Sequence, residues 1–211
     1  MFPNYTPRER FADACIHVVG VVGGLIAVTV LLIEAIPTLA PETTATVAIY
    51  GVAMVAMFSC SAAYHLIPRP SWKVILRRLD QAAIFLKIAG TYTPFALDKI
   101  GGMWGYSVFG AVWIAALAGA TAKLLLTSNW DHVSVVLYVA LGWAGLIILQ
   151  PLAASVSMTT LILLGAGGVL YTLGVIFHLW NSLPFQNAIW HLFVLAGTAC
   201  HFAAVTTAVF E

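Results

Sequence analysis

Apolar residues along the chain fall into seven long runs, which short polar or Pro- and Gly-containing breaks separate. A transmembrane helix needs about 20 predominantly apolar residues to cross the hydrocarbon core of a bilayer. The pattern therefore predicts an all-α, polytopic membrane protein whose seven transmembrane helices form one bundle. The predicted spans are roughly residues 12–36, 43–66, 79–97, 104–126, 133–150, 157–180 and 186–209.

The breaks between the runs are too short to hold a further domain, and no internal repeat is evident. We therefore expect residues 1–211 to form a single integral membrane domain. Lys123 and Asp131 bracket the link between the fourth and fifth runs, and the fifth run is only just long enough, so six spans are an alternative. The polar start MFPNYTPRERFADA leads directly into the first run without the features of a signal peptide, so we expect it to be retained.

The composition excludes a soluble globular domain. Hydrophobic residues make up 62% of the 211 residues and charged residues only 8%. The net charge of +1, without a basic stripe interleaved with aromatic residues, gives no indication of a nucleic-acid partner. The three cysteines lie inside apolar runs, which is typical of small buried residues and not of a disulfide framework.

Basic residues outside the apolar cores lie almost entirely on one side of the membrane in this topology. Loops rich in lysine and arginine stay on the cytoplasmic side during insertion. Seven basic residues share that side: Arg8, Arg10, Arg69, Lys73, Arg77, Arg78 and Lys123. The opposite side holds one basic residue, Lys99, together with acidic residues. We expect a multi-pass protein of the cell inner (plasma) membrane, with its N-terminus in the cytoplasm and its C-terminus outside.

Polar residues concentrate where the spans meet this cytoplasmic side. His65 ends the second run, Asp80 begins the third, His178 ends the sixth and His191 lies about one turn into the seventh. Ser61 precedes His65 by one helical turn, so the two share a face. Ionisable residues inside membranes are costly and usually face the bundle interior. Three imidazoles and a carboxylate at one depth are the ligand set of a zinc site with an open position.

Each of these residues also has a simpler interpretation. A lone histidine near a membrane interface is often hydrogen-bonded or directed towards water. Asp80 could pair with Arg77 or Arg78, and Ser61 could stabilise helix packing through its own backbone. His17, beside the glycine-rich stretch VVGVVGG, is interpreted as a packing or hydrogen-bonded residue.

Lys87 lies seven residues after Asp80, on the same face and roughly 10 Å deeper in the membrane. It could reach towards the site, bind an anionic group of a substrate or extend along the helix towards water. These alternatives stay open at the level of the sequence.

Several stretches together resemble a known family. SAAYH, RRLDQAAIFLKIAGTYTPFAL, YTLGVIFHLW and NAIWHLFVLAGTACHF are similar to the hemolysin III family, the bacterial branch of the progestin and adipoQ receptors, which includes the adiponectin receptors. The resemblance covers essentially the whole chain, including ADACIHVVG in the first run. It implies seven membrane helices, a zinc ion near the cytoplasmic side and a grouping with alkaline ceramidases. It also implies His65 and His191 as zinc ligands, Asp80 as partner of the zinc-bound water and Ser61 as its neighbour.

The seventh run departs from the family pattern His-x-x-x-His, because Asn187 stands at its first position. An amide oxygen is a poor zinc ligand beside imidazole, so we expect His178, which ends the neighbouring run, to supply the third ligand. His201 is the competing candidate, but it lies ten residues beyond His191, about 15 Å along one helix.

These residues lead to three functional hypotheses. The first is a zinc-dependent hydrolase of a lipid-like amide or ester, with His65, His191 and His178 holding the metal. Asp80 would accept a proton and Ser61 would stabilise an oxygen atom. A ceramide-like substrate follows from the family alone. The second is a non-enzymatic membrane sensor or regulator with structural zinc, and the third is haemolytic pore formation. Membrane lipid is the expected partner in each case.

Overall fold

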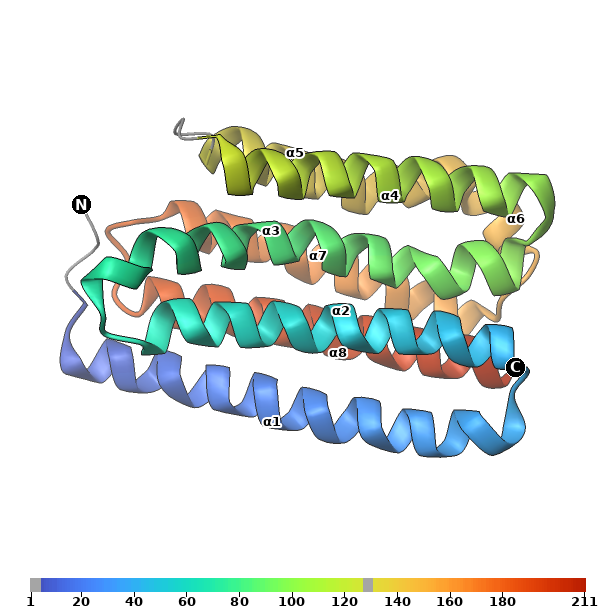
Figure 1. The fold of residues 1–211 in the computed structure, drawn as a ribbon, viewed down its shortest axis with the longest axis horizontal. Coiled ribbons are helices and arrows are strands. Elements are labelled where there is room, and N and C mark those ends of the chain that lie inside the picture. Colours follow the sequence, from blue (N-terminus) through green and yellow to red (C-terminus); the bar gives the residue numbers. More distant parts are fainter. Residues whose placement is uncertain (1–4, 127–130) are drawn as a thin grey trace.

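The long helices of the described residues lie side by side along the long axis of the molecule (Figure 1). The computed structural model describes residues 5–126 and 131–211, and within these ranges it contains helices and no strands. The link between α4 and α5 falls on residues 127–130, outside the described residues. The long helices are α1 (Pro7–Thr38), α2 (Pro41–Leu66), α3 (Pro70–Pro94), α4 (Gly102–Leu125), α5 (Asp131–Trp143), α7 (Met158–Leu179) and α8 (Gln186–Phe210).

Local sequence signals explain where several helices begin. At α1, the Thr6 side chain accepts from the backbone of Glu9 while the Glu9 carboxylate accepts from the backbone of Thr6, which is a capping box. Pro41 and Pro70 open α2 and α3 at the first helical position, where a missing N–H costs nothing. Ser157 caps α7 by accepting from a backbone N–H of its first turn.

The prediction of an all-α, seven-helix membrane bundle is confirmed. The fifth predicted span is one continuous segment in which α5 passes through a 3₁₀ turn, Ala144–Ile148, into the short helix α6 (Leu149–Ala153). Six segments of the described chain are long and apolar enough to cross a membrane, and α3 is not among them. Its charged residues explain this: Lys73, Arg77, Arg78, Asp80 and Lys87.

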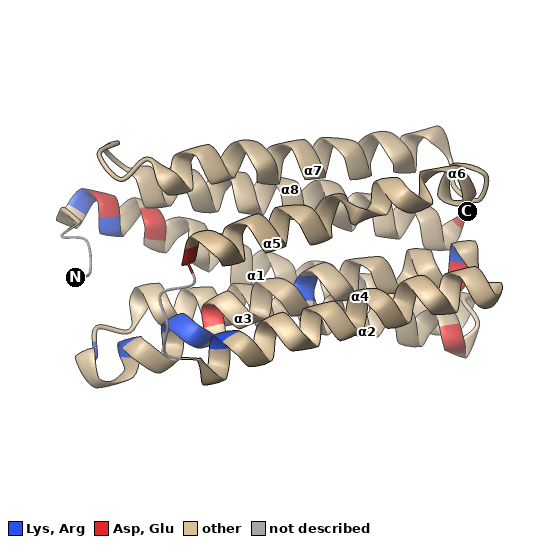
Figure 2. Ribbon diagram, turned by 90° about the horizontal axis from the view of Figure 1, so that it is seen from above, with Lys and Arg blue, Asp and Glu red and all other residues tan. Residues whose placement is uncertain are grey.

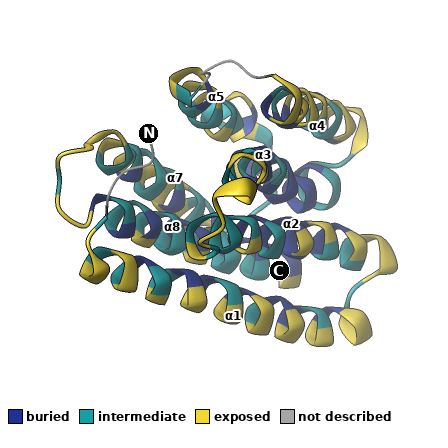
Figure 3. Cartoon of the chain, turned by 60° about the vertical axis from the view of Figure 1, so that its left-hand side comes forward, coloured by how far each residue is buried: buried dark blue, intermediate teal, exposed yellow. Residues whose placement is uncertain are grey.

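Helix α3 nevertheless lies in the middle of the bundle, between α2 and α4 (Figure 3). Small residues allow its close approach to α2, since a Cβ atom added at Gly90 would lie 2.7 Å from the Cβ of Ala53. Large apolar side chains on the outward faces of the surrounding helices are exposed, as lipid contact requires; examples are Ile33, Ile36, Ile114, Leu125, Val136 and Ile147. The polar helix is thus inside and the apolar ones are outside.

Most charged residues lie towards the two ends of the bundle, and Lys87 of α3 lies between them (Figure 2). The end where α1 and α3 begin carries most of the basic residues, whereas Lys99 lies near the other end in the π-helical turn Phe95–Ile100 that follows α3. The same basic end holds the last turn of α2 and of α7 and the first turns of α8 (Figure 1). The fold therefore brings the histidine-bearing helix ends to one level.

A candidate metal centre at one end of the bundle

Four residues from three helices form a group that could hold a metal ion. Asp13 and His17 lie one turn apart on α1, His65 lies in the last turn of α2, and His191 lies in the first turns of α8. One ligand atom from each of the four lies within 4.8 Å of the ligand atoms of the others. Asp13, His17 and His191 are buried and His65 is partly buried.

The Asp13 carboxylate lies at the centre of this group. Its Oδ1 is 2.6 Å from Nδ1 of His191, and its Oδ2 is 3.4 Å from both Nε2 of His17 and Nδ1 of His65. The three imidazole rings lie with their centroids 4.4–5.0 Å apart. Nε2 of His17 is buried without a hydrogen-bond partner. A buried nitrogen of this kind beside a carboxylate and two further imidazoles fits a metal ion that takes nitrogen and oxygen ligands.

Asn187, at the position where the resemblance described above implies a histidine, lies one turn before His191. Its Nδ2 donates to Asp13 Oδ2 at 2.9 Å and lies 3.1 Å from Nδ1 of His65 and 3.4 Å from Nδ1 of His191. The side chain of Asn187 is therefore inside the group and fixes Asp13. The carboxylate of Asp13 thus lies among the three imidazoles, held in place by Asn187.

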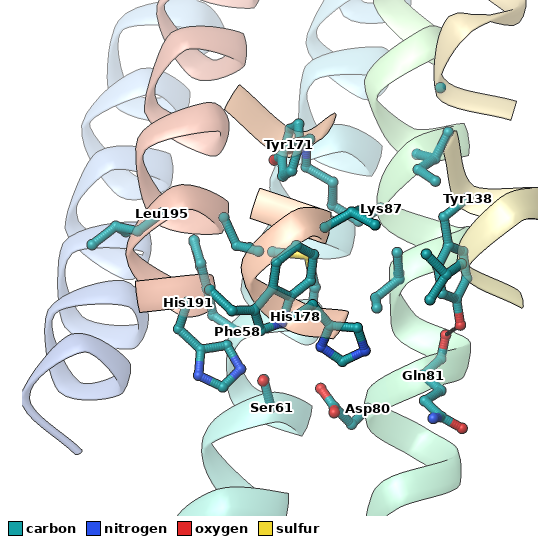
Figure 4. A pocket seen from close by; sticks show the side chains of 18 of the residues that line it. Phe58, Ser61, Asp80, Gln81, Lys87, Tyr138, Tyr171, His178, His191 and Leu195 are labelled. Carbon is teal, nitrogen blue, oxygen red and sulfur yellow. Dashed lines mark hydrogen bonds between the residues drawn. The ribbon is translucent and has the colours of Figure 1, made fainter. Parts of the chain in front are cut away.

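Asp80 and Ser61 lie next to each other in the wall of a cavity, from α3 and α2 respectively (Figure 4). The Ser61 hydroxyl is within hydrogen-bonding reach of the Asp80 carboxylate. Arg77 pairs with Asp131 at 2.5 Å, and Arg78 donates to the carbonyl of Leu124 at 3.0 Å. Among the described residues no ion pair to Asp80 is found, so pairing with a neighbouring arginine does not explain this carboxylate.

His178 borders the same cavity but does not belong to the four-residue group. Its ring packs against Trp190 with the centroids 5.0 Å apart, and its Nδ1 is buried without a hydrogen-bond partner. His201 lies deeper in the bundle, where its Nδ1 is 3.5 Å from the Lys87 ammonium. His201 is therefore not a member of the four-residue group that contains His191.

The cavity has a volume of about 1200 Å³ and extends from the candidate metal centre into the bundle. Asp13, His17, His65 and His191 line it, and most of the remaining lining side chains are apolar. Tyr5, just before α1, also borders it and donates to Gln186 at 3.4 Å. Burial, and after it the negative charge of Asp13, raises the pKa of the Tyr5 phenol.

Sequence reasoning missed Asp13 and interpreted His17 as a packing or hydrogen-bonded residue. The available signal was an aspartate and a histidine four residues apart inside an apolar run, which places both side chains on one face of α1. The same spacing relates Ser61 and His65 in α2, so it indicated a polar pair on α1 as well.

Fold and site together define a class: a multi-pass helical membrane protein with a candidate metal-binding group at one end of its bundle. A family model described as Haemolysin-III related matches residues 6–202, and the chain belongs to this family. It is 37% identical to the Hemolysin-3 homolog of Bacillus subtilis over 95% of this chain and 94% of that protein. It is 35% identical to Hemolysin-3 of Bacillus cereus over 94% and 90% of the two chains.

A mammalian relative is more distant. The human Monocyte to macrophage differentiation factor is 28% identical over 74% of this chain and 67% of that protein. No solved structure matches the chain. The resemblance inferred from the sequence motifs is thereby confirmed at the level of the family.

Proposed function

We propose that this protein is a zinc-dependent hydrolase that cleaves an amide or ester bond in a lipid-like substrate within the membrane. One observation carries the proposal: the candidate metal centre opens on a large, mostly apolar cavity that Asp80 and Ser61 also line. Pockets for drug-sized ligands usually measure about 300–1,000 Å³, so a cavity of about 1200 Å³ has room for a lipid chain.

The donor set supports zinc as the metal. Three imidazole nitrogens and one carboxylate oxygen are ligands that zinc takes in tetrahedral sites. Two ligand atoms about 2.0–2.1 Å from one ion lie roughly 3.3 Å apart in that geometry. The 3.4 Å distances from Asp13 Oδ2 to His17 and His65 match this spacing, whereas the 2.6 Å distance from Asp13 Oδ1 to Nδ1 of His191 is that of a hydrogen bond. Zinc bound there would polarise a substrate carbonyl and activate water for attack.

The other two residues then have distinct tasks. Asp80 accepts a proton at its carboxylate, since no arginine neutralises it. Ser61 would donate its single hydroxyl hydrogen either to that carboxylate or, once substrate is bound, to a substrate oxygen. His178, expected from the sequence to be the third ligand, lies outside the four-residue group, and its unpartnered Nδ1 at the cavity would contact the substrate.

A second function is favoured by the number of ligands. Four protein ligands complete a tetrahedral zinc site, and closed sites are typical of structural zinc. In that case the metal would tie α1, α2 and α8 together in a membrane sensor or regulator. A lytic activity, which the name of the Bacillus cereus relative suggests for that protein, has less support, because six segments of the described chain are long and apolar enough to cross a membrane, which is typical of a permanently inserted protein.

We also propose that the N-terminus is cytoplasmic and the C-terminus outside. The asymmetry of basic residues between the two ends of the bundle supports this orientation. The candidate metal centre would then face the cytoplasm.

Zinc analysis combined with lipid cleavage tests the hydrolase proposal. The purified protein is assayed for bound zinc and incubated with lipid amides and esters, ceramide among them, while released fatty acid is measured by mass spectrometry. Asp80→Asn should keep the zinc and lower hydrolysis by about 10²- to 10⁴-fold. The matched control is Asp98→Asn, a carboxylate held by Thr46 at the far end of the bundle. Zinc-loaded protein that releases no product from any substrate would leave the structural role as the better account.

A further inference from the structure

Lys87 projects into the cavity from the second half of α3, deeper in the bundle than His191 of the metal group (Figure 4). Only 3% of its surface is exposed. Among the described residues no carboxylate forms an ion pair with it, whereas the other buried lysine, Lys123, pairs with Asp131 at 3.3 Å. A buried cation without a counter-charge inside a membrane is costly, and such residues usually serve a ligand.

Hydrogen bonds around the ammonium have a fixed direction. Lys87 Nζ donates to the Tyr171 hydroxyl oxygen at 2.7 Å. Thr198 donates its hydroxyl hydrogen to the carbonyl of Val194 at 2.8 Å, so in the 2.6 Å contact with Tyr171 it accepts. The hydroxyl hydrogen of Tyr171 is therefore directed to Thr198, and the oxygen of Tyr171 remains free to accept from Lys87.

The second neighbour of the ammonium is also an acceptor. His201 Nε2 lies 3.2 Å from the carbonyl of Leu164, which requires the ring hydrogen on Nε2 and leaves Nδ1 as an acceptor. Nδ1 lies 3.5 Å from Lys87 Nζ. An ammonium has three N–H donors, and these two contacts use two of them. The third is available to an acceptor in the cavity.

The surroundings of Lys87 define the shape of such a ligand. Lys87 follows Asp80 by seven residues, about 10 Å along α3. Beyond Lys87 the cavity continues towards the C-terminal end of α3, where most of its lining is apolar: Phe95, Ile148, Leu152, Leu161 and Leu164. Thr91 and Tyr92 also line this part, but their hydroxyl groups donate to backbone carbonyls. A long hydrocarbon chain fits this part, with a polar end group at Lys87.

We propose that Lys87 binds the carboxylate of a long-chain acid inside the cavity, at a site separate from the metal group. One ammonium matches one negative charge. A phosphate monoester carries about −1.5 to −2 at neutral pH, and its excess charge would stay uncompensated in this apolar place. Tyr171 and His201 hold the ammonium in position and contribute no opposing positive charge when His201 is neutral.

This site requires neither zinc nor hydrolysis. A fatty acid from the membrane would occupy the chain-binding part of the cavity, and so would an acid released at the metal that moved inward. Binding is therefore measured on protein stripped of metal with a chelator, which separates this proposal from the hydrolase proposal.

The test compares oleate with oleyl alcohol, which has the same chain without the charge. Binding to the purified protein in detergent micelles is measured by equilibrium partitioning of radiolabelled ligand. Oleate should bind about tenfold or more tightly than the alcohol, and Lys87→Met should remove that difference while leaving the alcohol unaffected. Lys87→Arg should keep most of the difference in affinity between oleate and oleyl alcohol, and Lys123→Met should leave that difference unchanged.

Three results would overturn the proposal. Equal binding of oleate and oleyl alcohol to the wild-type protein would do so without any variant, and this comparison holds even if Lys87→Met fails to fold. Unchanged oleate binding in a folded Lys87→Met protein would exclude Lys87 as the site. Tighter, Lys87-dependent binding of oleoyl lysophosphatidate than of oleate would show that the group bound by Lys87 is a phosphate and not a carboxylate.

Discussion

Replacing Asp13 by asparagine should weaken zinc binding roughly 30- to 100-fold. The carboxylate touches each histidine of the metal group, at 2.6 Å for His191 and 3.4 Å for His17 and His65, and it accepts from Asn187 at 2.9 Å. An amide keeps the size but loses the charge. A hydrogen bond to a charged group contributes about 1.5–3 kcal/mol against about 0.5–1.5 for a neutral one. For the bonds from His191 and Asn187 the loss is about 2–3 kcal/mol, and 1.4 kcal/mol corresponds to tenfold.

The assay is a competition titration in which a chelator of known affinity removes zinc from the purified protein. Circular dichroism confirms that the variant keeps its helices. Asp98→Asn is the matched control, because it changes a carboxylate of the same chain at the opposite end of the bundle. An Asp13→Asn protein that stays folded and binds zinc within about threefold of the wild type would refute the reasoning, since the carboxylate would then neither ligate nor orient the histidines.

Three further predictions concern the same end of the bundle. Adding Asn187→His to Asp13→Asn should restore zinc binding, because residue 187 already lies within 3.4 Å of two imidazoles; continued loss of zinc would show that an imidazole there does not reach the ion. His17→Ala should lower zinc occupancy more than His178→Ala, measured by metal analysis, because His17 belongs to the four-residue group and His178 does not; the opposite order would move the centre towards α7. Reporters fused to the two chain ends should give opposite signals for the two sides of the membrane, and matching signals would contradict an odd number of spans.

The sequence predicted the number of helices, but it did not predict which helices pack against each other. Hydropathy fixes where a residue lies along the membrane normal, so His65 and His191 could be placed at one depth and are in fact neighbours. Which helix faces which depends on side-chain packing across the bundle. For this reason α1, with Asp13 and His17, was not expected to reach the group formed by α2 and α8.

The helix boundaries and side-chain orientations were also only partly predictable from the sequence. The third predicted span began at residue 79, but α3 begins at Pro70, because a proline at the first helical position starts the helix before the apolar region. His178 has the predicted depth, yet its ring packs on Trp190 of α8. The hydropathy pattern predicts how deep a residue lies in the membrane. The orientation of its side chain depends on packing contacts between helices, which the hydropathy pattern does not specify.

The polar character of α3 has a consequence for how the protein is made. Each charged residue at the centre of a membrane helix costs about 2.5–3.5 kcal/mol during insertion, and α3 carries Asp80 and Lys87 among its membrane-level residues. Its neighbours α2 and α4 are strongly apolar by comparison. Helix α3 is therefore a segment that the insertion machinery would release into lipid together with a flanking helix, as a hairpin, and not alone. During synthesis, the arrival of the next apolar helix would decide whether the third one stays in the bilayer.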